Sequence, residues 1–183
     1  MSGAGQWLHF TNEPTTHVDC WRFCSLRGDH HEIKIEADLI IFIDTKDMNR
    51  KRFLRLAYGD DIASTQAGLN KFLAEVKLEG PGVIVVPTLQ NFSHTMLATV
   101  IGEDAARAFL KDRTFSYHGS TISLCSDRTL NNFRSAKVYL ALWSSSHLID
   151  EIESLHNWRS LIWVTWLPNE ASAWKEAHNP ELF

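Results

Sequence analysis

The sequence has few cysteines and little glycine or proline. Its 183 residues include 3 cysteines, 9 glycines and 5 prolines. A small, odd number of cysteines is unlike the disulfide framework of a secreted domain and fits a reducing compartment, so we expect a cytoplasmic protein. So little glycine and proline excludes collagen-like and low-complexity chains. A chain of this length can bury a core without covalent cross-links.

Long apolar runs and an excess of one charge are also missing. No apolar segment approaches the roughly 20 residues that span a bilayer, and the first ten residues carry neither the basic cluster nor the apolar run of a secretory signal. We therefore expect no membrane association. The 18 lysines and arginines against 22 aspartates and glutamates give a net charge of -4, which disfavours a nucleic-acid partner.

What the sequence does contain is a series of short apolar runs separated by amphipathic segments. The runs are rich in Val, Ile and Trp, which is typical of strands buried in a covered sheet. They span residues 32–43, 83–86, 138–143 and 161–166. Apolar residues with helical period occupy 62–76, 96–109 and 148–155, and a last short helix is expected from Asn169.

Alternating strands and helices predict βαβ units and a mostly parallel sheet. We expect one α/β domain over residues 1–183, a three-layer αβα sandwich with a Rossmann-like sheet. Residues 1–31 form an N-terminal extension with a short helix near 15–26, and residues 32–183 form the core. The segment 115–124 alternates about a Gly-Ser centre and predicts an antiparallel hairpin or edge element.

Turn-forming and polar residues follow each predicted strand. In open α/β sheets, ligands bind beyond the carboxyl ends of the strands, where helix N-termini converge. We therefore expect a small, anionic ligand, phosphorylated or nucleoside-like, at this edge. The candidate lining residues are Asp44, Lys46, Thr88, His94, Ser144, Ser145 and Ser146. Polar loops and helix caps, with Asp60, Asp61 and the serines as caps, explain the same residues without a ligand.

Phosphate-binding motifs are missing from the sequence. No G-x-G-x-x-G follows a predicted strand, and there is no G-x-x-x-x-G-K-[ST], so a standard dinucleotide or P-loop enzyme is disfavoured and no cofactor is assigned. Basic residues cluster at Lys46, Arg50, Lys51, Arg52 and Arg55. We interpret this cluster mainly as a solvated helix face, with Arg50 kept as a ligand-binding candidate.

A catalytic role is left open. Asp44 and His94 follow different strands and are the candidates for a general base in a hydrolase or transferase. With Ser144 or Ser145 they could form a Ser-His-Asp relay, but the G-x-S-x-G elbow that exposes the serine in α/β-hydrolases is missing.

A metal site near the N-terminus is the weaker alternative. Potential ligands crowd one stretch: His17, Cys20, Cys24, His30 and His31. Their spacing matches no zinc finger or ribbon, and the two cysteines equally suit an apolar helix face, so no metal ligand is assigned.

Tryptophan is the most distinctive part of the composition. There are 7 tryptophans, and Trp163 and Trp166 should point to opposite faces of one strand. Trp158 and Trp174 are either core residues or part of an exposed aromatic surface. If they are exposed, the alternative function is a non-enzymatic interaction or regulatory protein that uses this surface in a homodimer or with another partner.

Overall fold

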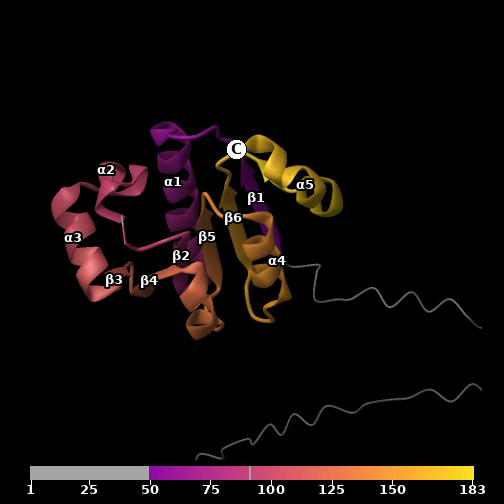
Figure 1. Ribbon diagram of the computed structural model, residues 1–183. Coiled ribbons are helices and arrows are strands. Elements are labelled where there is room, and N and C mark those ends of the chain that lie inside the picture. The colour runs from indigo at the N-terminus through magenta and orange to yellow at the C-terminus, as the bar shows by residue number, and fades with distance from the viewer. Residues whose placement is uncertain (1–49, 91) are drawn as a thin grey trace, which may run out of the picture. The chain divides into compact units, whose positions relative to one another are not determined.

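The computed structural model describes residues 50–90 and 92–183, which form a mostly parallel sheet with helices on both faces (Figure 1). The strands are β1 (Lys51–Arg55), β2 (Gly82–Val86), β3 (Thr114–Tyr117), β4 (Ser120–Ser126), β5 (Val138–Leu142), β6 (Ser160–Val164) and β7 (Glu181–Leu182). The α-helices are α1 (Ile62–Glu79), α2 (Met96–Ile101), α3 (Glu103–Asp112), α4 (Ser146–Ser154) and α5 (Ser172–His178). Short 3-10 helices are η2 (Phe92–His94), η3 (Asp127–Phe133) and η4 (Pro168–Ala171).

Several predictions fall outside the described residues. These are the helix at 15–26, the strand at 32–43, Asp44, Lys46 and the His17, Cys20, Cys24, His30 and His31 cluster. The single-domain boundaries 1–183 therefore stay a prediction.

The predicted three-layer α/β fold is confirmed for the described part of the chain. The strand order is β3-β4-β2-β5-β6-β1-β7. The three predicted strands that can be checked, β2, β5 and β6, are parallel neighbours in that order. The predicted hairpin is β3 with β4, which pair antiparallel, while β4 continues as a parallel partner of β2. The order differs from that of the dinucleotide-binding fold, so the Rossmann likeness is limited to the parallel, doubly covered sheet.

Each face of the sheet carries its own apolar core, as a sheet covered on both sides requires. On one face, α1, α2 and α3 pack over alternate strand residues that include Ile84 and Leu140. On the other face, α4, α5 and η3 pack over residues such as Val85 and Trp163. Because neighbouring strand residues point to opposite faces, the unbroken apolar runs of β2, β5 and β6 supply both cores.

The interpretation of the basic cluster as a helix face is wrong. Residues Lys51–Arg55 form strand β1, which lies between β6 and β7 in the interior of the sheet. Arg52 donates to both carboxylate oxygens of Glu153 at 2.8 and 3.0 Å, and Arg50 donates to the Leu155 carbonyl oxygen at 2.7 Å. Both guanidinium groups also lie over the Trp158 ring, at 4.4 and 5.2 Å from its centroid. These cations hold β1 against α4 instead of facing solvent.

The helices follow the predicted apolar stripes with two differences. The stripe at 96–109 is split into α2 and α3 at Gly102, whose φ of +86° a helix cannot accommodate. The terminal helix begins as η4 and becomes α5 only at Ser172. Asp61 caps α1 by accepting the Ser64 N–H, as predicted, whereas Ser145 occupies the cap position of α4 without a side-chain hydrogen bond.

Three of the five tryptophans that the structure describes, Trp158, Trp163 and Trp174, lie in the core. Trp158 and Trp174 are 2% and 5% exposed, so the aromatic interaction surface proposed for them is wrong. Trp174 packs edge-on against Trp163 and donates its indole N–H to Glu153 at 3.2 Å. Strand β6 ends at Val164, so Trp166 lies beyond the strand instead of within it and is 39% exposed.

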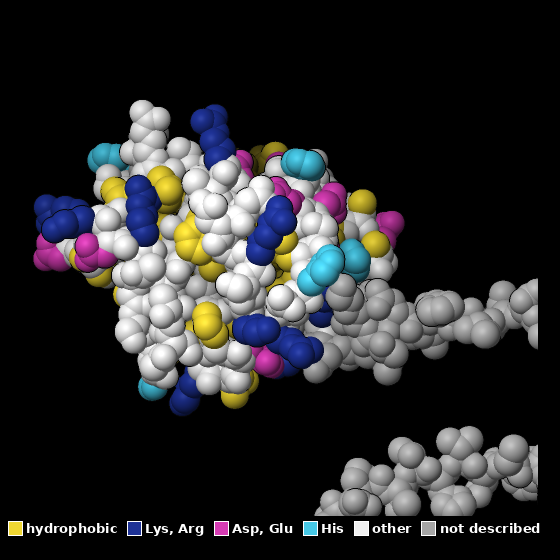
Figure 2. Space-filling view, turned by 90° about the horizontal axis from the view of Figure 1, so that it is seen from below, with side chains coloured by type: hydrophobic (Ala, Val, Ile, Leu, Met, Phe, Trp, Pro, Cys, Tyr) yellow, Lys and Arg dark blue, Asp and Glu magenta, His cyan; other side chains and the backbone are white. Residues whose placement is uncertain are grey.

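Figure 2 shows lysine and arginine side chains dispersed over one face, with polar and backbone surface between them. Within residues 50–90 and 92–183, no helix has the length and apolar character to cross a bilayer.

Candidate functional site

The connections that leave the parallel neighbours β2 and β5 run to opposite sides of the sheet. After β2 the chain passes through α2 and α3 on one face and continues, through β3, to β4, the outer neighbour of β2. After β5 it passes through α4 on the other face to β6, on the opposite side. Such a divergence separates the loops at the carboxyl ends of two adjacent strands and opens a crevice between them. Binding sites of open α/β sheets lie at this point.

A crevice of about 370 Å³ lies at this edge. We call it the carboxyl-edge crevice. Its walls come from the segments that follow β1, β2, β5 and β6, and its lining residues are Asp60, Ile62, His94, Thr95, Met96, Thr99, Trp143 and Trp166. Four loops that are far apart in the sequence thus meet because their strands run in one direction.

Trp143 has the most unusual backbone in the crevice. It follows β5 directly and has a φ of +55°, in the left-handed region that bulky residues avoid. Its N–H donates to the Val164 carbonyl oxygen at 2.8 Å, and the Ser144 carbonyl oxygen accepts the Trp163 indole N–H at 3.2 Å. These bonds on both sides hold the turn in place. Strained conformations of this kind cost about 1–3 kcal/mol and concentrate at functional sites.

The wall opposite is built by the loop that follows β1. The Gly59 N–H donates to the Trp166 carbonyl oxygen at 2.9 Å, and the φ of +61° at Gly59 turns the chain toward α1. Thr165 and Ala57 exchange two hydrogen bonds, from the Ala57 N–H to the threonine hydroxyl at 3.0 Å and from that hydroxyl to the Ala57 carbonyl at 3.1 Å. The loops after β1 and β6 are therefore joined, and they bring Asp60 and Trp166 to one crevice.

The third wall is the start of α2. The Thr95 hydroxyl donates to the Phe92 carbonyl oxygen at 2.7 Å, and the Thr95 hydroxyl oxygen accepts the Ala98 N–H at 3.4 Å as the helix cap. The Thr65 hydroxyl of α1 lies 3.9 Å from the Met96 sulfur, which links α1 to α2. A ligand that bound the Thr95 hydroxyl would disturb the cap of α2. The exposed Thr99 hydroxyl can contact a ligand without doing so.

The electrostatic character of the crevice is mildly acidic. Asp60 is its only carboxylate, and neither lysine nor arginine is among the lining residues of the described chain. Next to it, hydrogen bonds from the Ser64 hydroxyl and N–H lower the pKa of the Asp61 carboxyl, so that a negative charge already occupies the N-terminus of α1. A phosphate group finds no cationic partner in these walls.

The sequence-predicted site residues are only partly brought together. His94 lines the crevice, at the end of η2. Thr88 lies in the loop after β2 but outside the lining, and its hydroxyl accepts the Gln90 N–H at 3.3 Å. Ser145 and Ser146 begin α4 on the other face of the sheet. Arg50 precedes β1 and so lies at the amino edge, away from the crevice.

The predicted catalytic relay gains no support from the geometry. Ser144 is 1% exposed, and its hydroxyl donates to the Leu142 carbonyl oxygen at 3.3 Å, so it is not free to attack a substrate. Among the residues that the structure describes, none forms a hydrogen bond with the His94 side chain, so nothing there orients it as a base. Asp44 lies outside the described residues.

No group of three or more His, Cys, Asp or Glu side chains in the described segments could hold a metal ion. No protein family, curated protein or solved structure matches this chain. The crevice must therefore be interpreted from its own chemistry.

Sequence reasoning missed most of the lining. Asp60, Thr95 and Thr99 were overlooked as ligand contacts, and Trp166 was assigned to the strand. Strand β1 was the missing signal: once Lys51–Arg55 is known to be a strand, Asp60 follows it as His94 follows β2. The same rule that selected His94 would then have selected Asp60.

Proposed function

We propose that the protein binds a small nucleoside-like molecule in the carboxyl-edge crevice. The observation that carries the proposal is that two tryptophans, Trp143 and Trp166, line one crevice at the carboxyl edge, where the connections after β2 and β5 diverge. Indole rings provide large, flat surfaces on which a planar heterocycle stacks, and base stacking on aromatic side chains contributes about 1–3 kcal/mol per base. The strained turn at Trp143 supports the same assignment.

The polar lining suits the sugar of such a ligand. A carboxylate after a strand of an open α/β sheet accepts hydrogen bonds from ribose hydroxyls. Asp60 has this position, and Thr99 and His94 offer further donors and acceptors. The sequence predicts an anionic ligand that is phosphorylated or nucleoside-like. Because the lining has a carboxylate and lacks lysine and arginine among the described residues, we propose a neutral nucleoside in preference to the phosphorylated alternative.

Titration calorimetry with adenosine, adenosine monophosphate and ribose tests this proposal. We expect adenosine to bind, the monophosphate to bind several-fold more weakly, and ribose alone not to bind measurably. Trp166→Ala should weaken adenosine binding by about tenfold, which corresponds to about 1.4 kcal/mol of lost stacking. Asp60→Asn should weaken binding of adenosine but leave binding of the free base adenine unchanged.

Phe115→Ala is the matched control, because Phe115 and Trp166 have nearly equal exposed fractions, 38% and 39%, and Phe115 does not line the crevice. It should leave adenosine affinity unchanged. Equal weakening of adenosine binding by Trp166→Ala and Phe115→Ala would contradict the proposed site. Tighter binding of the monophosphate than of adenosine would contradict the proposed charge of the ligand.

A further inference from the structure

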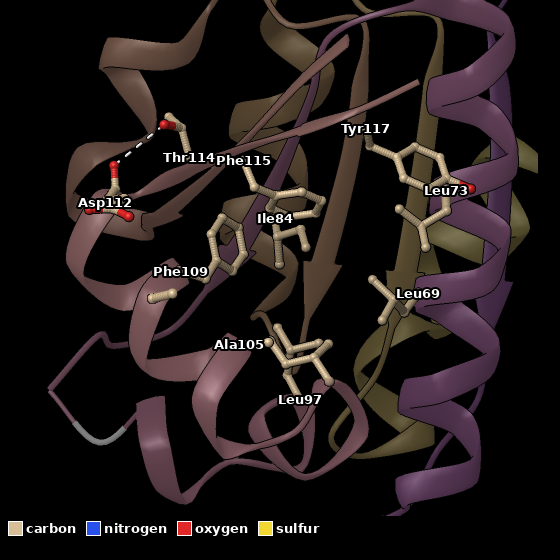
Figure 3. Close-up of a pocket in the computed structure, with 12 residues that line it drawn as sticks. Leu69, Leu73, Ile84, Leu97, Ala105, Phe109, Asp112, Thr114, Phe115 and Tyr117 are labelled. Carbon is tan, nitrogen blue, oxygen red and sulfur yellow. Dashed lines mark hydrogen bonds between the residues drawn. The ribbon is translucent and has the colours of Figure 1, made fainter. Parts of the chain in front are cut away.

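A second cavity, of about 400 Å³, lies between α1, α3 and strand β3. We call it the apolar cavity. It is lined by Leu69, Leu73, Ile84, Leu97, Ile101, Ala105, Ala108, Phe109, Asp112, Thr114, Phe115 and Tyr117. Figure 3 shows Leu69 and Leu73 of α1 facing Phe109 and Phe115 across the space, with Leu97 and Ala105 at its base. None of these residues belongs to the carboxyl-edge crevice.

The packing around the cavity explains why it is open. Helix α1 approaches β5 and β6 closely because Gly68 has no side chain there, while α3 follows the tight turn at Gly102. Phe109 is fixed edge-on between Phe92 and Phe115, at centroid distances of 6.3 and 4.9 Å. The walls are therefore held apart by rigid rings and by two helices that are anchored elsewhere.

The lining selects the chemistry of an occupant. Ligand pockets typically have volumes of roughly 300–1,000 Å³, mostly apolar walls and a few polar groups that orient the ligand. Here the only charged side chain in the lining is Asp112, which lies with Thr114 at one end of the cavity (Figure 3). The Thr114 hydroxyl donates to the Asp112 backbone carbonyl at 3.4 Å, and within the described chain no cation pairs with the Asp112 carboxylate.

We propose that the apolar cavity binds a small apolar molecule that ends in an ammonium or hydroxyl group. The hydrocarbon part fills the space between α1 and α3, where burial of apolar surface drives binding. The ammonium or hydroxyl group donates to the Asp112 carboxylate. An apolar molecule with a carboxylate end would place two negative charges together and should therefore bind more weakly.

Three probes of equal chain length separate the two parts of this proposal: decylamine, 1-decanol and decanoate, each below its micelle-forming concentration. Calorimetry with the full chain should show binding of the amine and the alcohol, and at least about tenfold weaker binding of decanoate. Asp112→Asn should make the affinities for amine and decanoate nearly equal.

Ala105→Phe places a ring in the cavity and should abolish binding of decylamine and decanol. Ala108→Phe serves the same purpose if the first variant does not fold. The matched control is Ala173→Phe, an exposed alanine of α5 on the other face of the sheet, which should bind as the unmodified chain does. Failure of all three probes to bind, or unchanged binding in a folded Ala105→Phe variant, overturns the site. Decanoate binding as tightly as decylamine overturns the assignment to Asp112.

Discussion

The backbone of Trp143 is strained, and the surrounding structure holds it in that conformation. Its left-handed backbone is unfavourable for any residue with a Cβ atom. Val164 and Trp163 fix the turn through hydrogen bonds on either side of it. If the conformation is maintained for the indole ring, then backbone strain and ligand binding can be separated by substitution.

Trp143→Gly should be more stable than Trp143→Ala by about 1 kcal/mol, because glycine adopts a positive φ without steric cost. Both variants should lose adenosine binding. Trp166 is the control, since its φ is not positive: there the alanine variant should be at least as stable as the glycine variant. Urea unfolding measures all four, and equal stability of the two Trp143 variants would show that the turn is unstrained.

Cys125 and Tyr139 make stability depend on pH in the alkaline range. Burial raises the pKa of the Cys125 thiol from 9.0 to about 12 and that of the Tyr139 hydroxyl from 10.0 to about 12. The unfolded chain therefore loses these protons at lower pH than the folded chain does. Their stabilising contribution is complete below pH 9 and is lost as the pH rises toward 12.

Cys125→Ala should reduce this loss of unfolding free energy by about 1 kcal/mol per pH unit between roughly pH 9.5 and 11. Val85→Ala is the control, because Val85 is the β2 residue paired with Cys125 and has no ionisable group. It should lower stability by the same amount at every pH. Parallel pH profiles of the unmodified chain and Cys125→Ala in guanidinium titrations would contradict the assigned burial.

At the level of secondary-structure elements, the close contact of α1 with the sheet depends on glycine. A Cβ atom at Gly68 would lie 2.5 Å from Val164 Cγ2, and one at Gly82 would lie 2.6 Å from Phe72 and from Val76. Since real Cβ atoms do not approach other heavy atoms so closely, the contacted side chains or α1 itself must shift if either glycine is replaced.

Gly68→Ala should therefore destabilise the protein by about 1–3 kcal/mol, although alanine is the better helix former. Ala74→Gly, at an exposed position of the same helix, supplies the scale: it should cost about 1 kcal/mol through helix propensity alone. Thermal unfolding measures the stability of both variants. If the contact tolerates a methyl group, Gly68→Ala would instead be stabilising.

The elements that could be predicted from the sequence are those whose apolar pattern is strong. Strands β2, β5 and β6 are uninterrupted apolar runs, and α1 and α4 have clear stripes with aspartate or serine before them. Strand β1 could not be predicted, because three of its five residues are basic. Lys51 is neutralised by Glu75 and Glu79, and Arg52 by Glu153, all of which lie 24 or more residues away in the sequence.

The candidate site was less predictable than the fold for the same reason. The rule that ligands bind at the carboxyl edge selected His94 correctly as a lining residue, but it could not select Asp60 without knowledge of β1. Nor could periodicity show that β6 ends at Val164, which leaves Trp166 beside the crevice. Pairings between distant segments, rather than local pattern, decide which loops meet.

In the molecule as a whole, the two faces of the sheet and its carboxyl edge differ in character. An apolar core lies on each face of the sheet, one of them with the apolar cavity beside it, and Trp158, Trp163 and Trp174 are buried in the other. Trp143 and Trp166 line the crevice at the carboxyl edge, where four loops converge. The central claim is that ligand binding occurs at Trp143 and Trp166 and leaves the tryptophans of the core unaffected.

The most direct test is an NMR titration of the indole N–H signals of the 7 tryptophans with adenosine, after assignment by single substitutions. The account predicts that the signals of Trp143 and Trp166 shift in a saturable manner, while those of Trp158, Trp163 and Trp174 stay in place. Shifts confined to the core tryptophans, or no saturable shift at Trp143 and Trp166, would contradict it.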